Sequence, residues 1–139
     1  MKVEKRSPKL GYRTAVIGLA ALSAGLFFGA AGSALAAPAA VIKMNDTPPK
    51  FVPDKVTIKV GQTVQWQNNA QTLHSVDADP SMVQDAKDIS LPAGAKPFDS
   101  GFMNPGATWE YTFTTPGTYK YTCVPHEKDG MMGTIEVTK

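Results

Sequence analysis

The stretch that decides the fold is residues 118–137, TYKYTCVPHEKDGMMGTIEV. Its two ends alternate apolar and polar side chains, with Tyr119 and Tyr121 at the start and Ile135 and Val137 at the end. Successive side chains of a β-strand point to opposite faces, so this pattern indicates two half-buried strands. The residues between them, CVPHEKDGMMG, are then the loop that joins the two strands.

The same alternation recurs in short runs towards the N-terminus, at residues 40–44, 56–60, 64–67 and 109–113. Turn residues such as Asn68-Asn69 and Pro116-Gly117 separate the runs. Period-two runs at these intervals predict half-buried strands in an antiparallel sandwich or barrel. The inward positions give a predicted core of Trp66, Trp109, Tyr111, Phe113, Tyr121 and Ile135.

Residues 76–102 break this rhythm, because they are polar, acidic and interrupted by proline and glycine. We interpret them as a long surface excursion, a solvated connection without a part in chemistry. Pro80 is suited to the first turn of a helix, which predicts a short helix around Ser81 to Ala86.

Four side chains with metal-binding chemistry remain to be placed. Cys123 continues the period of the inward tyrosines and should enter the end of the core. His126 and Met131 follow in the same loop, and His74 in QTLHSV is the second and last histidine. Thiolate and thioether are soft ligands, and two histidines, one cysteine and a weak axial methionine form the donor set of blue-copper electron-transfer sites.

The spacing C-x2-H-x4-M, with an isolated histidine about fifty residues upstream, resembles the plastocyanin and pseudoazurin branch of the cupredoxins. The segments CVPH, GMMG, VGQTVQWQN and PGTYKYTC carry the resemblance across the chain. It implies a Greek-key sandwich of about eight strands that binds one copper ion through His74, Cys123, His126 and Met131. The family usually has asparagine after the first histidine, where it ties the ligand loops together. Here Ser75 stands there, and its hydroxyl is expected to make part of that contact.

The N-terminal 36 residues have the build of a secretory signal peptide. A basic opening is followed by an apolar run and the small residues AGSALAAPAA. We predict cleavage after Ala36, with Ala37 as the second choice, and a copper-binding domain over residues 37–139. A retained membrane anchor is the alternative, but the apolar run is shorter than the ~20 residues a spanning helix needs. No adjacent arginine pair is present, which favours the ordinary secretory route and a periplasmic or otherwise exported protein.

The predicted mature chain has nine lysines, eleven acidic residues and no arginine. A phosphate-reading nucleic-acid protein is therefore not expected. Its single cysteine cannot form an internal disulfide and needs burial or ligation in an oxidising compartment. We expect a monomer without a membrane span after signal cleavage.

The favoured function is one-electron transfer by Cu(I)/Cu(II) cycling, with a c-type cytochrome or a copper or haem oxidoreductase as partner. The partner is expected to dock over His126, beside Pro125 and Met132. A periplasmic copper carrier or storage protein is the main alternative. Structural zinc sites use more thiolates and no thioether, and a hydrolytic Cys–His pair needs a substrate cleft and an oxyanion hole. A multicopper oxidase needs further histidines, so we expect no enzymatic activity.

Overall fold

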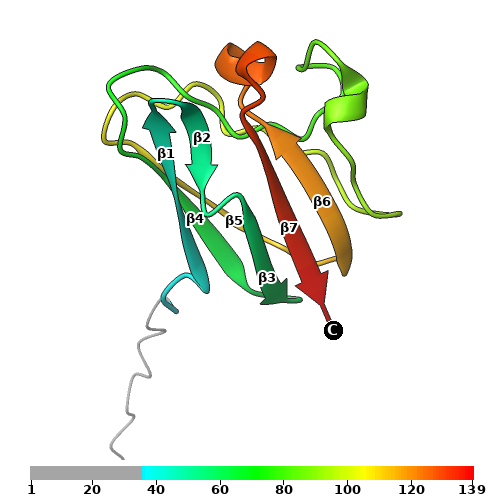
Figure 1. Cartoon of the computed structure of the whole chain (residues 1–139). Helices are drawn as coiled ribbons and strands as arrows, with labels where there is room; N and C mark the ends of the chain where they lie inside the picture. Colours follow the sequence, from blue (N-terminus) through cyan, green and yellow to red (C-terminus); the bar gives the residue numbers. More distant parts are fainter. Residues whose placement is uncertain (1–35) are drawn as a thin grey trace, which may run out of the picture. The chain divides into compact units, whose positions relative to one another are not determined.

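The computed structural model describes residues 36–139, so the predicted signal peptide lies outside the described residues except for its last position. These residues form seven strands in two sheets (Figure 1). The first sheet has the order β2-β1-β4-β5 and the second the order β3-β7-β6. The strands are β1 (Ala40–Asp46), β2 (Pro49–Val52), β3 (Lys55–Lys59), β4 (Thr63–Asn68), β5 (Thr108–Thr112), β6 (Gly117–Thr122) and β7 (Met132–Thr138).

The predicted β-sandwich is confirmed, but the expectation of purely antiparallel sheets is wrong. β1 pairs with β4 and β3 pairs with β7 in parallel, whereas the other strand pairs are antiparallel. The alternation of apolar and polar side chains indicates which residues face the core. It is the same in parallel and in antiparallel strand pairs, so it does not predict the direction of pairing. β2 was not predicted, because prolines stand at its first position and directly after its end, and proline interrupts a strand pattern.

The core lies between the sheets and is rich in aromatic rings. Trp66 and Tyr121 are fully buried, with their ring centroids 5.5 Å apart and edge to face. The indole Nε1 of Trp66 donates a hydrogen bond of 3.1 Å to the Tyr121 hydroxyl, which satisfies both polar atoms inside the core. Of the predicted core residues, Trp109 and Tyr111 are only partly buried and pack against the cluster.

The segment of residues 76–102 is only partly the surface excursion that was expected. Val76, Asp77, Ala78 and Phe98 are buried, and Asp77 forms isolated bridges with both Asp99 and Thr122. The excursion therefore begins by closing the edge of the second sheet beside β6. This was missed because single β-bridges need no run of alternating residues.

The predicted helix around residues 81–86 is also wrong. A short 3-10 helix, η1, lies slightly later at Ala86–Asp88, and the Asp85 side chain caps it by accepting from the Lys87 backbone N–H at 2.9 Å. An aspartate that accepts from the first turn marks a helix start more strongly than an upstream proline. A second 3-10 helix, η2 (Val124–Asp129), joins β6 to β7 and lies beyond their ends (Figure 1).

Candidate metal centre

Three of the four predicted ligand residues meet at one end of the sandwich. The Cys123 Sγ lies 3.5 Å from the Nδ1 atom of His74 and 3.5 Å from the Nδ1 atom of His126. The imidazole ring centroids are 4.6 Å apart, and the three ligand atoms lie within 4.8 Å of one another. Both rings therefore direct the same nitrogen at one buried sulfur.

Cys123 enters the site directly after β6, at the inward position that the alternation predicted. It is fully buried, and its backbone N–H donates to the Met131 carbonyl at 3.0 Å. Burial raises the pKa of its thiol, and a backbone N–H from Ser75, 3.3 Å from the sulfur, works in the opposite direction. A thiol kept protonated by burial must release its proton when it becomes a metal ligand.

His74 comes from the segment that follows β4. Its backbone N–H donates to the Met103 carbonyl at 3.2 Å, and its carbonyl accepts from the Met103 N–H at 2.7 Å. These two bonds hold the backbone of His74 against the segment around Met103. The ring is fully buried, and this burial lowers its pKa. A neutral imidazole at neutral pH is the form that binds a metal ion.

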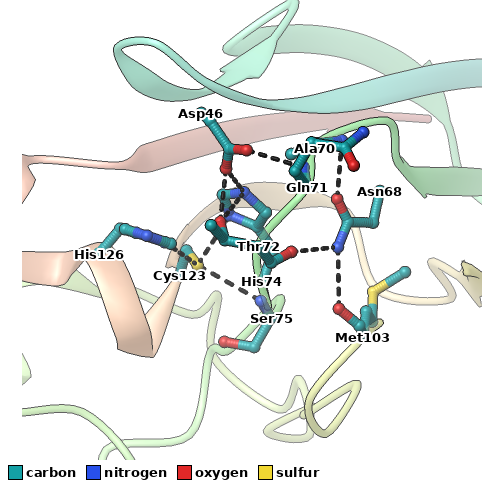
Figure 2. A network of polar contacts seen from close by, with 10 residues as sticks. All are labelled: Asp46, Asn68, Ala70, Gln71, Thr72, His74, Ser75, Met103, Cys123 and His126. Carbon is teal, nitrogen blue, oxygen red and sulfur yellow. Dashed lines mark hydrogen bonds and ion pairs between the residues drawn. The ribbon is translucent and has the colours of Figure 1, made fainter. Parts of the chain in front are cut away.

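Two polar residues that the sequence analysis did not identify hold the His74 segment (Figure 2). Asp46, at the end of β1, has its Oδ1 atom 3.0 Å from His74 Nε2. The buried Asn68 side chain donates to the carbonyls of Thr72 and Met103 at 2.9 and 2.8 Å. Asp46 is 28 positions from His74 in the chain, so only the parallel pairing of β1 with β4 brings them together.

The Asp46 carboxylate is held in its ionised form. A hydrogen bond from the Thr72 hydroxyl and one from the Gln71 backbone N–H lower its pKa to about 2. An ionised carboxylate only accepts hydrogen bonds, so His74 Nε2 carries the ring proton in this contact. The lone pair is then on Nδ1, the atom that faces Cys123.

His126 lies in η2, in a turn that returns the chain to β7. Its backbone N–H donates to the Cys123 carbonyl at 3.0 Å, and its carbonyl accepts from Met131 at 3.2 Å. Gly130 ends η2 with φ of 75°, a left-handed conformation that glycine adopts without strain. The His126 ring is half-buried, in contrast with the fully buried His74.

The next residue, Glu127, ties this loop to the excursion. Its buried carboxylate accepts the backbone N–H groups of Gln84 and Asp85, each at 2.8 Å. The ligand loop is thus braced from outside by a charge-assisted pair of hydrogen bonds. The loop position of Glu127 gave no sequence indication of this role.

Of the two adjacent methionines, Met131 is fully buried and Met132 is partly exposed. Met131 directly follows the loop, and its carbonyl accepts hydrogen bonds from Cys123 N–H and the Thr122 hydroxyl at 3.0 Å each. This places its backbone beside Cys123. The sequence pattern predicted that Met131 points inward and Met132 outward, and the burial of the two side chains agrees with this.

Ser75 joins the two ligand segments, as its position after His74 predicted. Its Oγ accepts from the Val124 backbone N–H at 3.0 Å and donates to the Asp77 carboxylate. Its own N–H points to the Cys123 sulfur. The serine therefore bonds both to the Cys123 sulfur and to the backbone of the next residue, Val124, and its hydroxyl is held in turn by the buried Asp77 carboxylate.

The donor set fits copper better than other common metals. It combines one cysteine sulfur and two imidazoles with a buried methionine, Met131, whose carbonyl accepts from the Cys123 N–H. His74, Cys123 and His126 are the chain's complete supply of histidine and cysteine. Calcium and magnesium need oxygen ligands, and a structural zinc site has four nitrogen or sulfur ligands without a thioether. A closed set of soft and borderline donors in a β-sandwich defines a cupredoxin with a type 1 copper site.

Comparisons with known proteins agree with this class. The model of the copper-binding proteins of the plastocyanin/azurin family matches residues 38–138, so the chain belongs to that family. The plastocyanin of Scenedesmus fuscus is 40% identical over 89 residues, which cover 63% of this chain and 85% of that one.

Two solved structures share the fold. An oxidised amicyanin variant aligns with a TM-score of 0.55 at 26% identity, over 75% of this chain and 86% of that one. A pseudoazurin from Hyphomicrobium denitrificans aligns with a TM-score of 0.56 at 21% identity, over 71% of this chain and 74% of that one, a likeness of fold alone. Copper-based electron transfer is the chemistry of this family. Within residues 36–139, no helix has the length and apolar character needed to cross a membrane.

Proposed function

We propose that this protein carries single electrons between redox proteins, with one copper ion held by His74, Cys123, His126 and Met131. The observation that carries the proposal is the convergence of two imidazole Nδ1 atoms on one buried sulfur, 3.5 Å from each. Bound copper supplies a Cu(I)/Cu(II) couple, and the protein acts as an electron carrier and not as an enzyme.

The surrounding contacts support electron transfer over metal delivery. Each ligand segment is held by its own hydrogen bonds: His74 through Asp46 and Met103, and Cys123 through Ser75 and Met131. Ligands that are fixed before metal binding change little between oxidation states, which keeps the reorganisation small. A site that hands its metal to another protein needs ligands that can be displaced, and here Cys123 and His74 are fully buried.

His126 is the proposed point of electron exchange, because it is the histidine that reaches the surface. Pro125 beside it is exposed and Met132 is partly exposed, so an apolar rim is available for docking. We propose that the partner is a c-type cytochrome or a copper or haem oxidoreductase in the same compartment. We also propose that the protein binds this partner as a monomer. Of the acidic residues in the excursion, Asp77 is buried, and the other four, Asp79, Asp85, Asp88 and Asp99, are exposed or partly exposed. Because residues 37–139 carry nine lysines against eleven acidic residues, we propose that charge steers the partner only modestly.

The proposed location is the periplasm or another exported compartment, after removal of residues 1–36. The N-terminal sequence of the protein secreted by its host tests this: a chain that begins at Pro38 or Ala37 is expected. A retained N-terminus would contradict cleavage and favour the membrane-anchor alternative.

Colour separates the two candidate functions. The copper-loaded protein is expected to be intensely blue as Cu(II), to bleach when reduced, and to regain its colour on oxidation without loss of metal. A colourless Cu(I) form that a chelator strips readily would favour the carrier or storage function instead.

The docking site is tested by replacing Met132 with lysine. We expect slower electron exchange with the partner while the copper spectrum is unchanged, because Met132 is partly exposed and faces away from the core. Val60→Lys, at an exposed apolar position beside Thr138 at the far end of β7, adds the same charge and is the matched control. Equal exchange rates in the wild-type protein and in Met132→Lys would move the docking surface elsewhere.

A further inference from the structure

The contact between Asp46 and His74 gives the metal centre an additional charged group. Asp46 is the last residue of β1, and its side chain is 26% exposed. Its Oδ1 atom lies 3.0 Å from His74 Nε2, and its Oδ2 atom accepts from the Gln71 backbone N–H at 2.7 Å. The Thr72 hydroxyl donates to the same carboxylate (Figure 2). One side chain therefore joins β1 to three positions of the segment that carries His74.

This contact determines which nitrogen of His74 is available. The imidazole can carry its proton on either nitrogen, and only the nitrogen without a proton can bind a metal ion. Because the carboxylate accepts, the proton is on Nε2 and the lone pair is on Nδ1. The Nδ1 atom is the one that lies 3.5 Å from Cys123 Sγ.

In the folded protein Asp46 is the main partner of this nitrogen. The His74 side chain is fully buried, and besides Asp46 only the Thr72 hydroxyl, 3.5 Å away, is recorded near Nε2 within residues 36–139. The half-buried His126 has no such need, since its ring reaches the surface. The two ligands thus differ in what keeps their rings in place.

We propose that Asp46 is a positioning residue of the metal centre: it fixes the His74 ring and its tautomer for metal binding, and its negative charge lowers the reduction potential. This proposal rests on the assignment of His74 as a copper ligand. The charge acts through the imidazole, where it raises the basicity of the ligand atom and favours the more positive Cu(II) state.

Two variants separate the geometric and the electrostatic parts. Asp46→Ala removes every contact of the carboxylate, and copper affinity is expected to fall about 10–100-fold, as for other partners of ligating histidines. Asp46→Asn keeps one oxygen that can accept from Nε2, removes the charge and gives up the acceptor for the Gln71 backbone N–H. Its expected effect is a raised reduction potential with a much smaller loss of affinity. Asp54→Asn, an exposed position between β2 and β3, is the control for the change in net charge.

The experiment begins on the metal-free protein. Nitrogen NMR of histidine-labelled protein is expected to show His74 as a single Nε2–H tautomer in the wild type and in Asp46→Asn, and a tautomer mixture in Asp46→Ala. Copper titration with a competing chelator and voltammetry on the loaded proteins then give affinity and potential.

The outcomes are distinct. An unchanged tautomer and affinity in Asp46→Ala, or a potential in Asp46→Asn equal to that of Asp54→Asn, would overturn the proposal. A wild-type protein that shows the expected tautomer but never becomes blue would support the Asp46 contact and contradict the proposed function.

Discussion

The two halves of the metal centre are built differently. The His74 half is buried and held from the first strand by Asp46, from the segment around Met103 and by the Asn68 side chain. The His126 half is a single short loop, half-exposed and braced by Glu127 against the excursion. Cys123, at the end of β6, stands between them.

This difference indicates a division of work. A buried ligand held by several elements fixes the position of the ion, whereas a ligand at the surface offers the shortest path to a partner. Loops carry contact functions because they lie at the surface, and rigid elements carry positioning functions. The following predictions test that division, beginning with the residue that both halves share.

Cys123→Ser is expected to have the largest effect, a complete loss of the intense visible band. The band requires charge transfer from thiolate to copper, and the Cys123 sulfur is the atom on which both imidazoles converge. The absorption spectrum of the copper-loaded variant decides it. A serine variant that stayed blue would show that Cys123 is not the sulfur ligand of the copper ion.

His126→Gly and His74→Gly should differ in their response to added imidazole. Both variants are expected to lose the blue band. Free imidazole should restore it in His126→Gly, because the missing ring leaves a gap at the surface, and should fail in His74→Gly, where the gap is buried. Titration of each copper-loaded variant with imidazole measures this. Restoration in both, or only in His74→Gly, would contradict the assignment of the buried and exposed halves.

Met131→Leu is expected to retain copper with a raised potential, because loss of the weak axial donor disfavours Cu(II). A rise of about 60 mV corresponds to a tenfold change in the relative affinity for the two oxidation states. Met132→Leu is the matched control, since the Met132 side chain points outward at the first position of β7. Voltammetry compares them, and a larger shift in Met132→Leu would reverse the choice of ligand.

Asp77 is predicted to make the stability of the His74 half depend on pH. Burial, with the nearby Asp99 adding to it, raises the pKa of its carboxyl from 3.8 to about 7. At a pH between these two pKa values, Asp77 is deprotonated in the unfolded chain and protonated in the folded chain. The contribution to stability therefore falls as pH rises from about 4 to about 7, by at most about 1.4 kcal/mol per pH unit.

Chemical unfolding of the metal-free protein at several pH values, compared with Asp77→Asn, isolates this contribution. The difference in stability between variant and wild type should grow in favour of the variant up to about pH 7 and then level off. Asp54→Asn is expected to follow the wild-type curve. A constant difference between Asp77→Asn and the wild type would exclude the effect.

The regular part of this molecule could be predicted from sequence because it depends on alternation. Period-two patterning predicts six of the seven strands found within residues 36–139. It also predicts the inward faces of Tyr119, Tyr121 and Cys123 and the burial of Met131. Strand direction does not affect that pattern, so the parallel pairs were missed. β2 was hidden by its prolines.

The metal centre was predictable only in part, for a related reason. The loop spacing and the family resemblance pointed to His74, Cys123, His126 and Met131, and three of them lie together in the structure. Asp46, Asn68 and Glu127 could not be found, because each acts through backbone groups or side chains that the fold brings near. Such residues have no spacing of their own in the sequence.

The most direct test of the central claim is a crystal structure of the copper-loaded protein, with the metal located by its anomalous scattering. One copper is expected, bonded to Nδ1 of His74, Nδ1 of His126 and Sγ of Cys123, with Met131 as the weaker fourth ligand, and with Asp46 still on His74 Nε2. Copper bound through Nε2 of His74, or at a place away from Cys123, would contradict the account.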